Sequence, residues 1–224
     1  MASPGLVILS KEQVAFLQIA GKYQLIADEY YLTGGTPLAA FYLGHRYSED
    51  LDFFIEKSEV NILAIKKFIR SVQRKFSFKK ITYQNYQGLH MFFLEYPNGV
   101  TLKVDFNYYP FSRIETGKRE FGVLIDSLHD IAVNKIQTIA TRTTAKDFID
   151  LYCIVTNTDF NISQLIKDAR IKFDWHIGPM QFGKQFLKVT ELKDLPRMIA
   201  PVAEHEWKKF FIEEAKKLKP EILE

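Results

Sequence analysis

A pair of glycines just before two closely spaced aspartates limits the folds open to this chain. The stretch reads LTGGTPLAAFYLGHRYSEDLDFF over residues 32–54. Gly34 and Gly35 allow a tight turn after a short strand, because glycine adopts backbone angles that other residues avoid. Asp50 and Asp52 lie in a second run that otherwise has the pattern of a buried strand. The fold must therefore place two acidic side chains on a sheet, close to a glycine turn.

A short helix is expected directly after that turn. Thr36 is a favourable N-cap residue, and Pro37 suits the first helical position because its missing N–H needs no partner there. The helix is expected to end near residue 43. A helix N-terminus carries a partial positive charge, and glycine lets backbone N–H groups approach an anion. The stretch is suited to binding phosphate, although the two glycines alone are also typical of an ordinary strand-to-helix turn.

The two aspartates need a cation nearby if they share one face of a sheet. Alternate side chains of a strand point to opposite faces, so Asp50 and Asp52 lie together and the apolar residues between them lie on the other face. If the strand at residues 101–109 lies beside this one, Asp105 joins them. Three carboxylates could hold two Mg²⁺ ions, which would activate a hydroxyl and stabilise a leaving pyrophosphate. The alternative is a pair of acids on a solvent-facing strand.

Periodicity divides the rest of the chain into a mixed part and a helical part. We expect helices at residues 11–27 and 60–74, three antiparallel strands between residues 76 and 109, and one short strand near residues 121–127. The pattern is helical from residue 128 onward. Five helices are expected there, at residues 128–141, 145–156, 161–172, 180–189 and 203–218.

The predicted fold class is therefore α+β. Residues 1–127 are expected to form a mixed or antiparallel sheet with flanking helices, and residues 128–224 a C-terminal helical domain. A chain of 224 residues is long enough for one large domain or for one domain with a helical addition.

Composition places the chain among ordinary globular proteins. Hydrophobic residues make up 47% and charged residues 25%, and no apolar stretch approaches the roughly 20 residues of a membrane span. The N-terminal apolar patch has no basic region before it, so we expect no signal peptide and a cytoplasmic protein. The single cysteine, Cys153, excludes an intrachain disulfide and a cysteine zinc site. Its apolar surroundings predict a core thiol.

Positive charge is concentrated in one segment. Residues 60–80 contain seven basic side chains and no acid, which is consistent with binding RNA phosphates and also with a solvated helix face. The segment lacks aromatic residues at a surface that could contact bases, since Phe68, Phe76 and Phe78 are expected in the core. The basic residues are Lys66, Lys67, Arg70, Arg74, Lys75, Lys79 and Lys80.

Two motifs together resemble those of a known family. GGTPLAAFYLGHRYSEDLDFF at residues 34–54 and LHDIAVNKIQTIATRTTAKDFIDLY at residues 128–152 are similar to signatures of the AbiEii/AbiGii-type nucleotidyltransferase toxins, within the polymerase-β-like nucleotidyltransferase superfamily. The resemblance covers roughly residues 30–155. It implies a polymerase-β-like core and a Mg²⁺-dependent enzyme that moves NMP from an NTP to an acceptor hydroxyl and releases pyrophosphate.

The resemblance also implies roles for individual residues. The family's carboxylate pair falls on Asp50 and Asp52 and its third acid on Asp105, as catalytic metal ligands. Its helical lysine falls on Lys135, and the first acid of its KD-x-x-D motif falls on Asp147. These five residues are the expected catalytic set.

Lys135 and Asp147 each have a second interpretation. Lys135 lies within the apolar stripe of its helix, where a buried ammonium needs a phosphate or a carboxylate, unless it reaches solvent instead. Asp147 follows Thr144 by three residues, which also suits an acid in the first turn of a helix. Asp150 and Lys146 are expected to be structural.

Nucleotide contacts are expected from residues beside the motifs. Gly34, Gly35 and Thr36 would contact the triphosphate, and Arg46 and Arg142 are candidates for phosphate contacts. For His45 we expect a role in stabilising the turn.

The acceptor remains open at this level. In the family it is RNA, often a tRNA end, or a protein residue, and the enzyme is the toxin of a toxin–antitoxin or phage-defence pair with a cognate antitoxin. One alternative is nucleotidylation of a small molecule such as an antibiotic, with the C-terminal helices forming a small pocket. Another is a binding protein without catalysis, although the retained glycines and aspartates argue against it.

Overall fold

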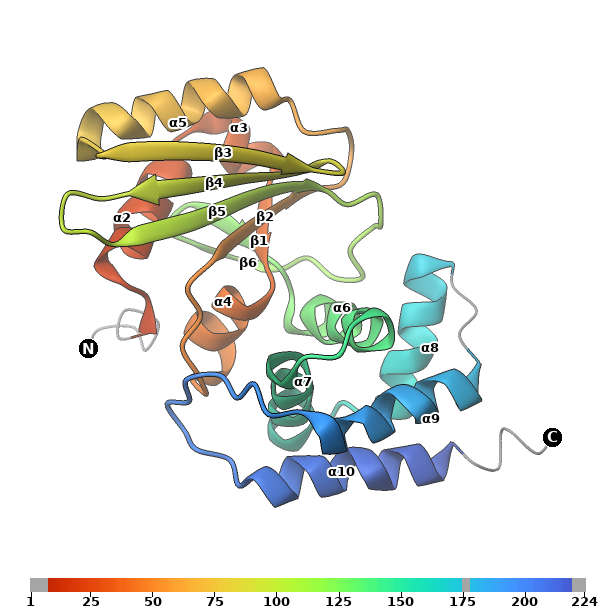
Figure 1. Cartoon of the computed structure of the whole chain (residues 1–224). Coiled ribbons are helices and arrows are strands. Elements are labelled where there is room, and N and C mark those ends of the chain that lie inside the picture. Colours follow the sequence, from red (N-terminus) through yellow and green to blue (C-terminus); the bar gives the residue numbers. More distant parts are fainter. Residues whose placement is uncertain (1–7, 175–177, 219–224) are drawn as a thin grey trace. The chain divides into compact units, whose positions relative to one another are not determined.

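A computed structural model describes residues 8–174 and 178–218 of the chain (Figure 1). The described residues form two compact units. The first comprises residues 8–42 and 48–127, and the second comprises residues 43–47, 128–174 and 178–218. Residues 43–47, which the sequence assigned to the first domain, group with the second unit because His45 and Arg46 bind Asp150 there.

One mixed sheet forms the middle of the first unit. Its seven described strands lie in the order β3-β4-β5-β2-β1-β7-β6. Strands β3, β4 and β5 are antiparallel, as expected, whereas β2 pairs parallel with β5 and antiparallel with β1. Strand β6 was not predicted. The strands are β1 (Tyr31–Thr33), β2 (Leu51–Ile55), β3 (Lys80–Tyr86), β4 (Leu89–Glu95), β5 (Thr101–Tyr108), β6 (Lys118–Glu120) and β7 (Val123–Ile125).

Three helices of the first unit supply its apolar core together with the sheet. They are α2 (Lys11–Ala20), α3 (Gln24–Glu29) and α5 (Ile62–Phe76). Phe16 of α2 packs edge-on against Phe68 of α5 and also contacts Phe53 of β2, and all three rings are fully buried. Ile65, Ile69 and Val72 of α5 are buried as well, so this helix has an apolar face in the core.

The single helix expected at residues 11–27 is wrong in one respect. It begins at a capping box formed by Ser10 and Gln13 but stops at Ala20, and α3 follows after a turn. A Cβ atom on Gly21 would lie 1.9 Å from the carbonyl oxygen of Phe121. The helix ends next to Gly21, where the turn between β6 and β7 packs against the backbone. Only glycine leaves room for the Phe121 carbonyl at this position.

The helix after the glycine turn begins earlier than predicted. Gly34, with φ of 84°, is the residue before α4 (Gly35–Pro37), so the N-cap role expected of Thr36 is wrong. Thr36 lies inside the first turn, and its hydroxyl donates to the backbone carbonyl of Asp50 instead. The helix continues as the wider η1 turn (Leu38–Leu43).

Helices form the second unit. The five expected helices are confirmed, each within one or two residues at the ends: α6 (Leu128–Thr141), α7 (Ala145–Asn157), α8 (Ile162–Phe173), α9 (Pro179–Leu187) and α10 (Glu204–Lys217). A short η2 turn (Lys188–Glu191) follows α9. Phe148, Phe186 and Phe211 form an aromatic core between α7, α9 and α10. Among the described helices, none has the length and apolar character that crossing a membrane requires.

Candidate active site

Two of the predicted carboxylates lie side by side in the first unit. In the parallel pairing of β2 and β5, Asp52 is opposite Asp105. Their neighbours Leu51, Phe53 and Val104 are fully buried on the other face of the sheet. The sequence expectation that these two strands are adjacent, with both acids on one face, is therefore confirmed.

Gly34 approaches the same aspartate from the strand-to-helix turn. A Cβ atom at Gly34 would lie 2.9 Å from Oδ2 of Asp52, and the φ of +84° is itself unfavourable for other residues. Thr36, two residues on, donates its hydroxyl to the backbone carbonyl of Asp50. The glycine turn is thus packed directly against the segment that carries both aspartates.

Lys103 supplies a positive charge between two of the acids. Its ammonium nitrogen lies 2.7 Å from Oδ2 of Asp105 and 3.2 Å from Oδ2 of Asp50. Burial favours the neutral amine, but the hydrogen bond and charge of Asp105 prevail and raise the pKa of Lys103. Lys103 was not among the residues expected in the site, although alternation along β5 places it on the face of Asp105. The i, i+2 spacing of a lysine and an acid was the available signal.

Asp105 is the most enclosed of the three acids, with 4% of its surface exposed. Burial raises its pKa, and Lys103 opposes that shift. Its Oδ1 atom is buried and has no hydrogen-bond partner. A buried carboxylate oxygen without a partner is uncommon, and a cation can satisfy it.

The three acids fit a hard divalent cation by the chemistry of their oxygen donors and by the unsatisfied Oδ1 of Asp105. Within residues 8–174 and 178–218, however, no three His, Cys, Asp or Glu side chains are grouped as a metal site. Lys103 provides the neutralising charge for Asp50 and Asp105 instead.

A fourth acid near this face was missed in the sequence. Asp126 is fully buried after β7, and its Oδ2 accepts a 2.6 Å hydrogen bond from Thr33. Thr33 is the β1 residue opposite Asp52. The backbone carbonyl of Asp126 also accepts a hydrogen bond from the hydroxyl of Tyr42, 2.8 Å away. Asp126 therefore contacts both Thr33, just before the glycine turn, and Tyr42, near the end of η1.

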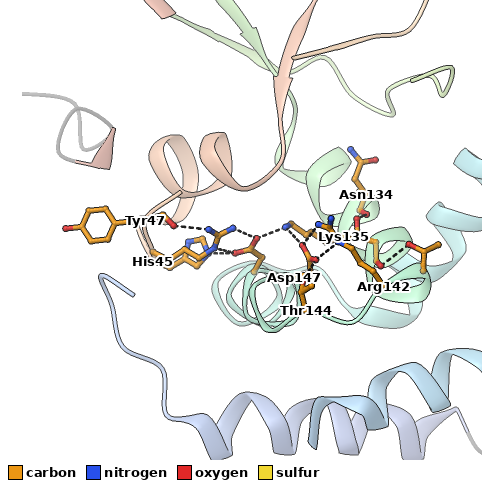
Figure 2. A network of polar contacts seen from close by, with 11 residues as sticks. His45, Tyr47, Asn134, Lys135, Arg142, Thr144 and Asp147 are labelled. Carbon is orange, nitrogen blue, oxygen red and sulfur yellow. Dashed lines mark hydrogen bonds and ion pairs between the residues drawn. The ribbon is translucent and has the colours of Figure 1, made fainter. Parts of the chain in front are cut away.

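The second unit contains a buried network of charges that includes His45, Lys135 and Asp147 (Figure 2). Arg46 donates from Nε and Nη2 to the two oxygens of Asp150, at 2.6 and 2.8 Å. His45 Nε2 lies 2.8 Å from Oδ1, and the ammonium of Lys135 lies 2.6 Å from Oδ2. Arg46 also donates to the carbonyl of Tyr47. Asp150 thus fastens residues 45–47 to α7, which agrees with the structural role expected of it.

Lys135 joins Asp150 to a second buried acid. Its ammonium lies 2.7 Å from Oδ1 of Asp147, and only 7% of the residue is exposed, so the alternative in which Lys135 reaches solvent is wrong. Asp147 also accepts from Arg142 at 3.0 Å and from the hydroxyl of Thr144 at 2.5 Å. The anions that satisfy Lys135 are therefore two carboxylates of its own unit.

The carboxylates and the ammonium group of this network are stabilised in their charged forms. Burial acts to raise the pKa values of Asp147 and Asp150, but the charge of Lys135 and the hydrogen bonds lower both below their usual range. Burial likewise acts to lower the pKa of Lys135, and the two carboxylates raise it. Each member is costly to remove, because its partners would remain charged and buried.

The two arginines predicted to contact phosphates, Arg46 and Arg142, differ in their exposure. Arg46 is buried and its guanidinium is bound by Asp150 and Tyr47, so its phosphate contact stays a prediction with no contact here to support it. The Arg142 side chain is 56% exposed while it contacts Asp147 from one side. Arg142 therefore has donors that can reach an anion in solvent. Lys146 is exposed, as suits a residue with no role in the site.

Comparison with known proteins gives the family. Residues 21–221 match the family described as Nucleotidyl transferase AbiEii toxin, Type IV TA system. An uncharacterized protein of Aquifex aeolicus (strain VF5) is 30% identical over 151 residues, which cover 66% of this chain and 68% of that protein.

Solved structures share the fold. JHP933 of Helicobacter pylori is 19% identical, with a TM-score of 0.60, over 99% of this chain and 94% of that one. The nucleotidyltransferase toxin MenT4 of Mycobacterium tuberculosis H37Rv is 15% identical, with a TM-score of 0.62, over 98% of this chain and 86% of that one. The matched range contains every predicted site residue, and the chain belongs to the AbiEii family of nucleotidyltransferase toxins.

Proposed function

We propose that this nucleotidyltransferase moves NMP from an NTP onto a hydroxyl of RNA, with a tRNA end as the first acceptor to test, and that it needs Mg²⁺. The observation that carries the proposal is the contact set on one sheet face: Gly34 against Asp52, and Asp52 opposite Asp105. A glycine turn for phosphates and adjoining carboxylates for metal ions are the two parts that transfer from a triphosphate requires.

In this proposal Asp50, Asp52 and Asp105 hold the divalent ions. Bound Mg²⁺ would neutralise phosphate charge and make the acceptor hydroxyl more acidic. Lys103, which contacts Asp50 and Asp105, keeps the acids paired while no nucleotide is bound. The backbone of Gly34, Gly35 and Thr36 at the start of α4 binds the triphosphate.

The proposed reaction exchanges the same bonds as any nucleotidyl transfer from an NTP. The acceptor oxygen forms a bond to the α-phosphorus, the bond from that phosphorus to the β-phosphate oxygen breaks, and pyrophosphate and the hydroxyl proton leave. In the second unit, Arg142 stays a candidate for contact with an anion, because its side chain is 56% exposed. Lys135 and Asp147 keep Arg142 and α7 in position through their shared contacts.

A protein partner is part of the proposal. The family is described as the toxin of a toxin–antitoxin system. We therefore expect a cognate antitoxin that protects cells making this chain.

The test is an incubation with each α-labelled NTP, Mg²⁺ and, separately, total RNA, total protein or a small-molecule extract. We expect label to enter RNA with one NTP preferred, pyrophosphate to be released, and EDTA to stop the reaction. Label entering only protein or small molecules would overturn RNA as the acceptor. No transfer under any condition would overturn the proposed activity.

A further inference from the structure

A hollow on the first unit has the features of a site for one unstacked base. It lies between helix α5 and the strands β3 and β4, with a volume of about 260 Å³. Figure 1 shows α5 running along β3, which is the strand at the edge of the sheet. Its lining combines apolar and polar side chains. We call it the α5–β3 hollow; its apolar lining residues are Ile69, Ile81 and Phe92, and Lys66, Arg70, Gln73 and Tyr83 complete the lining.

The hollow holds the aromatic side chain that the basic segment lacked in the sequence. Phe68 and Phe78 are in the core, as expected, but Tyr83 comes from β3 and lines the hollow. Its hydroxyl lies 2.8 Å from Nδ1 of His90, and its ring packs 5.0 Å from that of Phe92. The Tyr83 ring is therefore held in place before any ligand arrives.

A cation already covers this ring. The ammonium of Lys66 lies 4.2 Å from the centroid of Tyr83. A base that stacks on Tyr83 would displace this flexible side chain toward the phosphate attached to that base. The exchange is favourable because stacking on an aromatic ring is stronger than an exposed cation–π contact.

Positive charge continues from the hollow along the helix. Lys66, Arg70 and Arg74 follow at intervals of four residues, so each lies about 6 Å from the next along one side of α5. There is no acid from residue 60 to residue 94, although the whole chain carries a net charge of only +3. In the part of the chain that the structure describes, none of the seven basic residues of this segment forms an ion pair with an acid. A row of unpaired cations is complementary to a chain of phosphates.

The hollow is separate from the candidate active site. Tyr83 pairs with Phe92, Phe92 with Val104, and Val104 with Leu51, so all four lie on the helix-covered face of the sheet. Asp52 and Asp105 lie on the opposite face. A ligand in the hollow therefore does not occupy the place of the NTP.

We infer that the α5–β3 hollow and the cations beside it bind single-stranded RNA, with one unstacked base against Tyr83 and the neighbouring phosphates on Lys66, Arg70 and Arg74. The volume is below the roughly 300–1,000 Å³ typical of pockets for whole drug-sized ligands, which suits one ring system and not a complete nucleotide. A duplex keeps its bases stacked and could not fill the hollow. This inference rests on the proposed function only for the choice of RNA as the ligand to test.

The experiment measures binding of a short fluorescent single-stranded RNA to the full chain, without NTP, at several salt concentrations. Lys66→Gln/Arg70→Gln should weaken binding at least tenfold and reduce the slope of log affinity against log salt by about 1.4, since each lost phosphate contact removes about 0.7. The matched control, Lys188→Gln/Lys209→Gln, removes two exposed lysines of the second unit and should bind like the original protein.

A second pair of variants tests the base site. Tyr83→Leu should weaken binding at least about fivefold without changing the salt slope, whereas Tyr83→Phe should bind within twofold of the original protein. Thermal melts confirm that each variant is folded. The inference is overturned if Tyr83→Leu binds normally, if the glutamine pair behaves like its control, or if duplex RNA binds as tightly through the same residues.

The outcome is independent of the transfer assay. If the variants lose single-stranded RNA while no label enters RNA, the binding site stands and RNA falls as the acceptor. If label enters RNA while the variants bind normally, the proposed function stands and the hollow is not an RNA site.

Discussion

Asp52 of β2 lies opposite Asp105 of the parallel strand β5, although 52 residues separate them in sequence. The chain between them forms α5, β3 and β4 before it returns to the same face. The two acids are therefore held together by the topology of the sheet. Lys103 contacts Asp105 and also Asp50, and its positive charge offsets the repulsion between those two acids.

Replacing that ammonium should make the protein more responsive to metal. Lys103→Met leaves Asp105 buried with no cationic partner, so the variant should melt at a lower temperature than the original protein in EDTA. Mg²⁺ or Mn²⁺ should then raise its melting temperature more than that of the original protein, because the metal takes over the neutralising role. The measurement is a pair of thermal melts with and without metal. Equal metal responses in the two proteins would argue against a metal at these acids.

Gly34→Ala should impair nucleotidyl transfer more than the strain of a positive φ alone would. The new Cβ meets Oδ2 of Asp52 at 2.9 Å and also requires a φ of +84°, a combination that costs about 1–3 kcal/mol or more. Gly99→Ala is the matched control, since its φ is +85° and no atom lies within 4 Å of the added Cβ. Both variants should lose stability in thermal melts, but only Gly34→Ala should lose transfer. Equal activity in the two would mean that the turn does not shape the site.

Asp150→Asn should destabilise the second unit strongly. The carboxylate is fully buried and is shared by His45, Arg46 and Lys135, so its loss leaves buried cations without their anion. Breaking a buried ion pair costs roughly 3–5 kcal/mol. Chemical denaturation monitored by aromatic fluorescence would measure the loss. Lys146→Gln, on the exposed side of the same helix, should change stability little, and a similar loss there would contradict the account.

The same network sets the pH range in which the second unit is most stable. Asp147 and Asp150 have lowered pKa values when folded, so their stabilisation is present above the unfolded value of about 3.9 and is lost as pH falls through the folded values. Lys135 has a raised pKa, so its stabilisation is present below about 10.4 and is lost as pH rises through its folded value. The stability difference between the original protein and Asp150→Asn should be flat from about pH 5 to 9. A difference that disappears near pH 6 would be inconsistent with these shifts.

Most elements could be predicted because their signals are local. The five C-terminal helices and the strand pattern of β3 to β5 follow from apolar periodicity alone. Cys153, expected in the core, is buried, and burial raises the pKa of its thiol to about 12. The wrong predictions concern positions where contacts with distant segments determine the local structure. The helix ends near Gly21, which packs against Phe121, and Thr36 bonds to Asp50 instead of capping a helix.

Long-range contacts also explain which parts of the candidate site could not be predicted from the sequence. The side of the sheet that carries Asp52 and Asp105 could be derived, because alternation along a strand fixes it. The binding of Arg46 and Lys135 by Asp150 could not, because it depends on contacts between α6, α7 and residues 45–47 that no short pattern encodes. Tyr83 likewise joins the basic face of α5 only through the packing of β3.

The carboxylates are the centre of the account, and Asp52→Ala tests them most directly. Transfer of label from α-labelled NTP is measured for this variant, for the original protein and for Asp28→Ala, which removes an exposed acid of α3. A melt in EDTA shows whether each variant is folded, and Asp52→Ala should be, because removing one of several close carboxylates relieves repulsion. The account predicts that Asp52→Ala is folded and transfers no detectable label, while Asp28→Ala transfers normally. Transfer by folded Asp52→Ala at the original rate would contradict it.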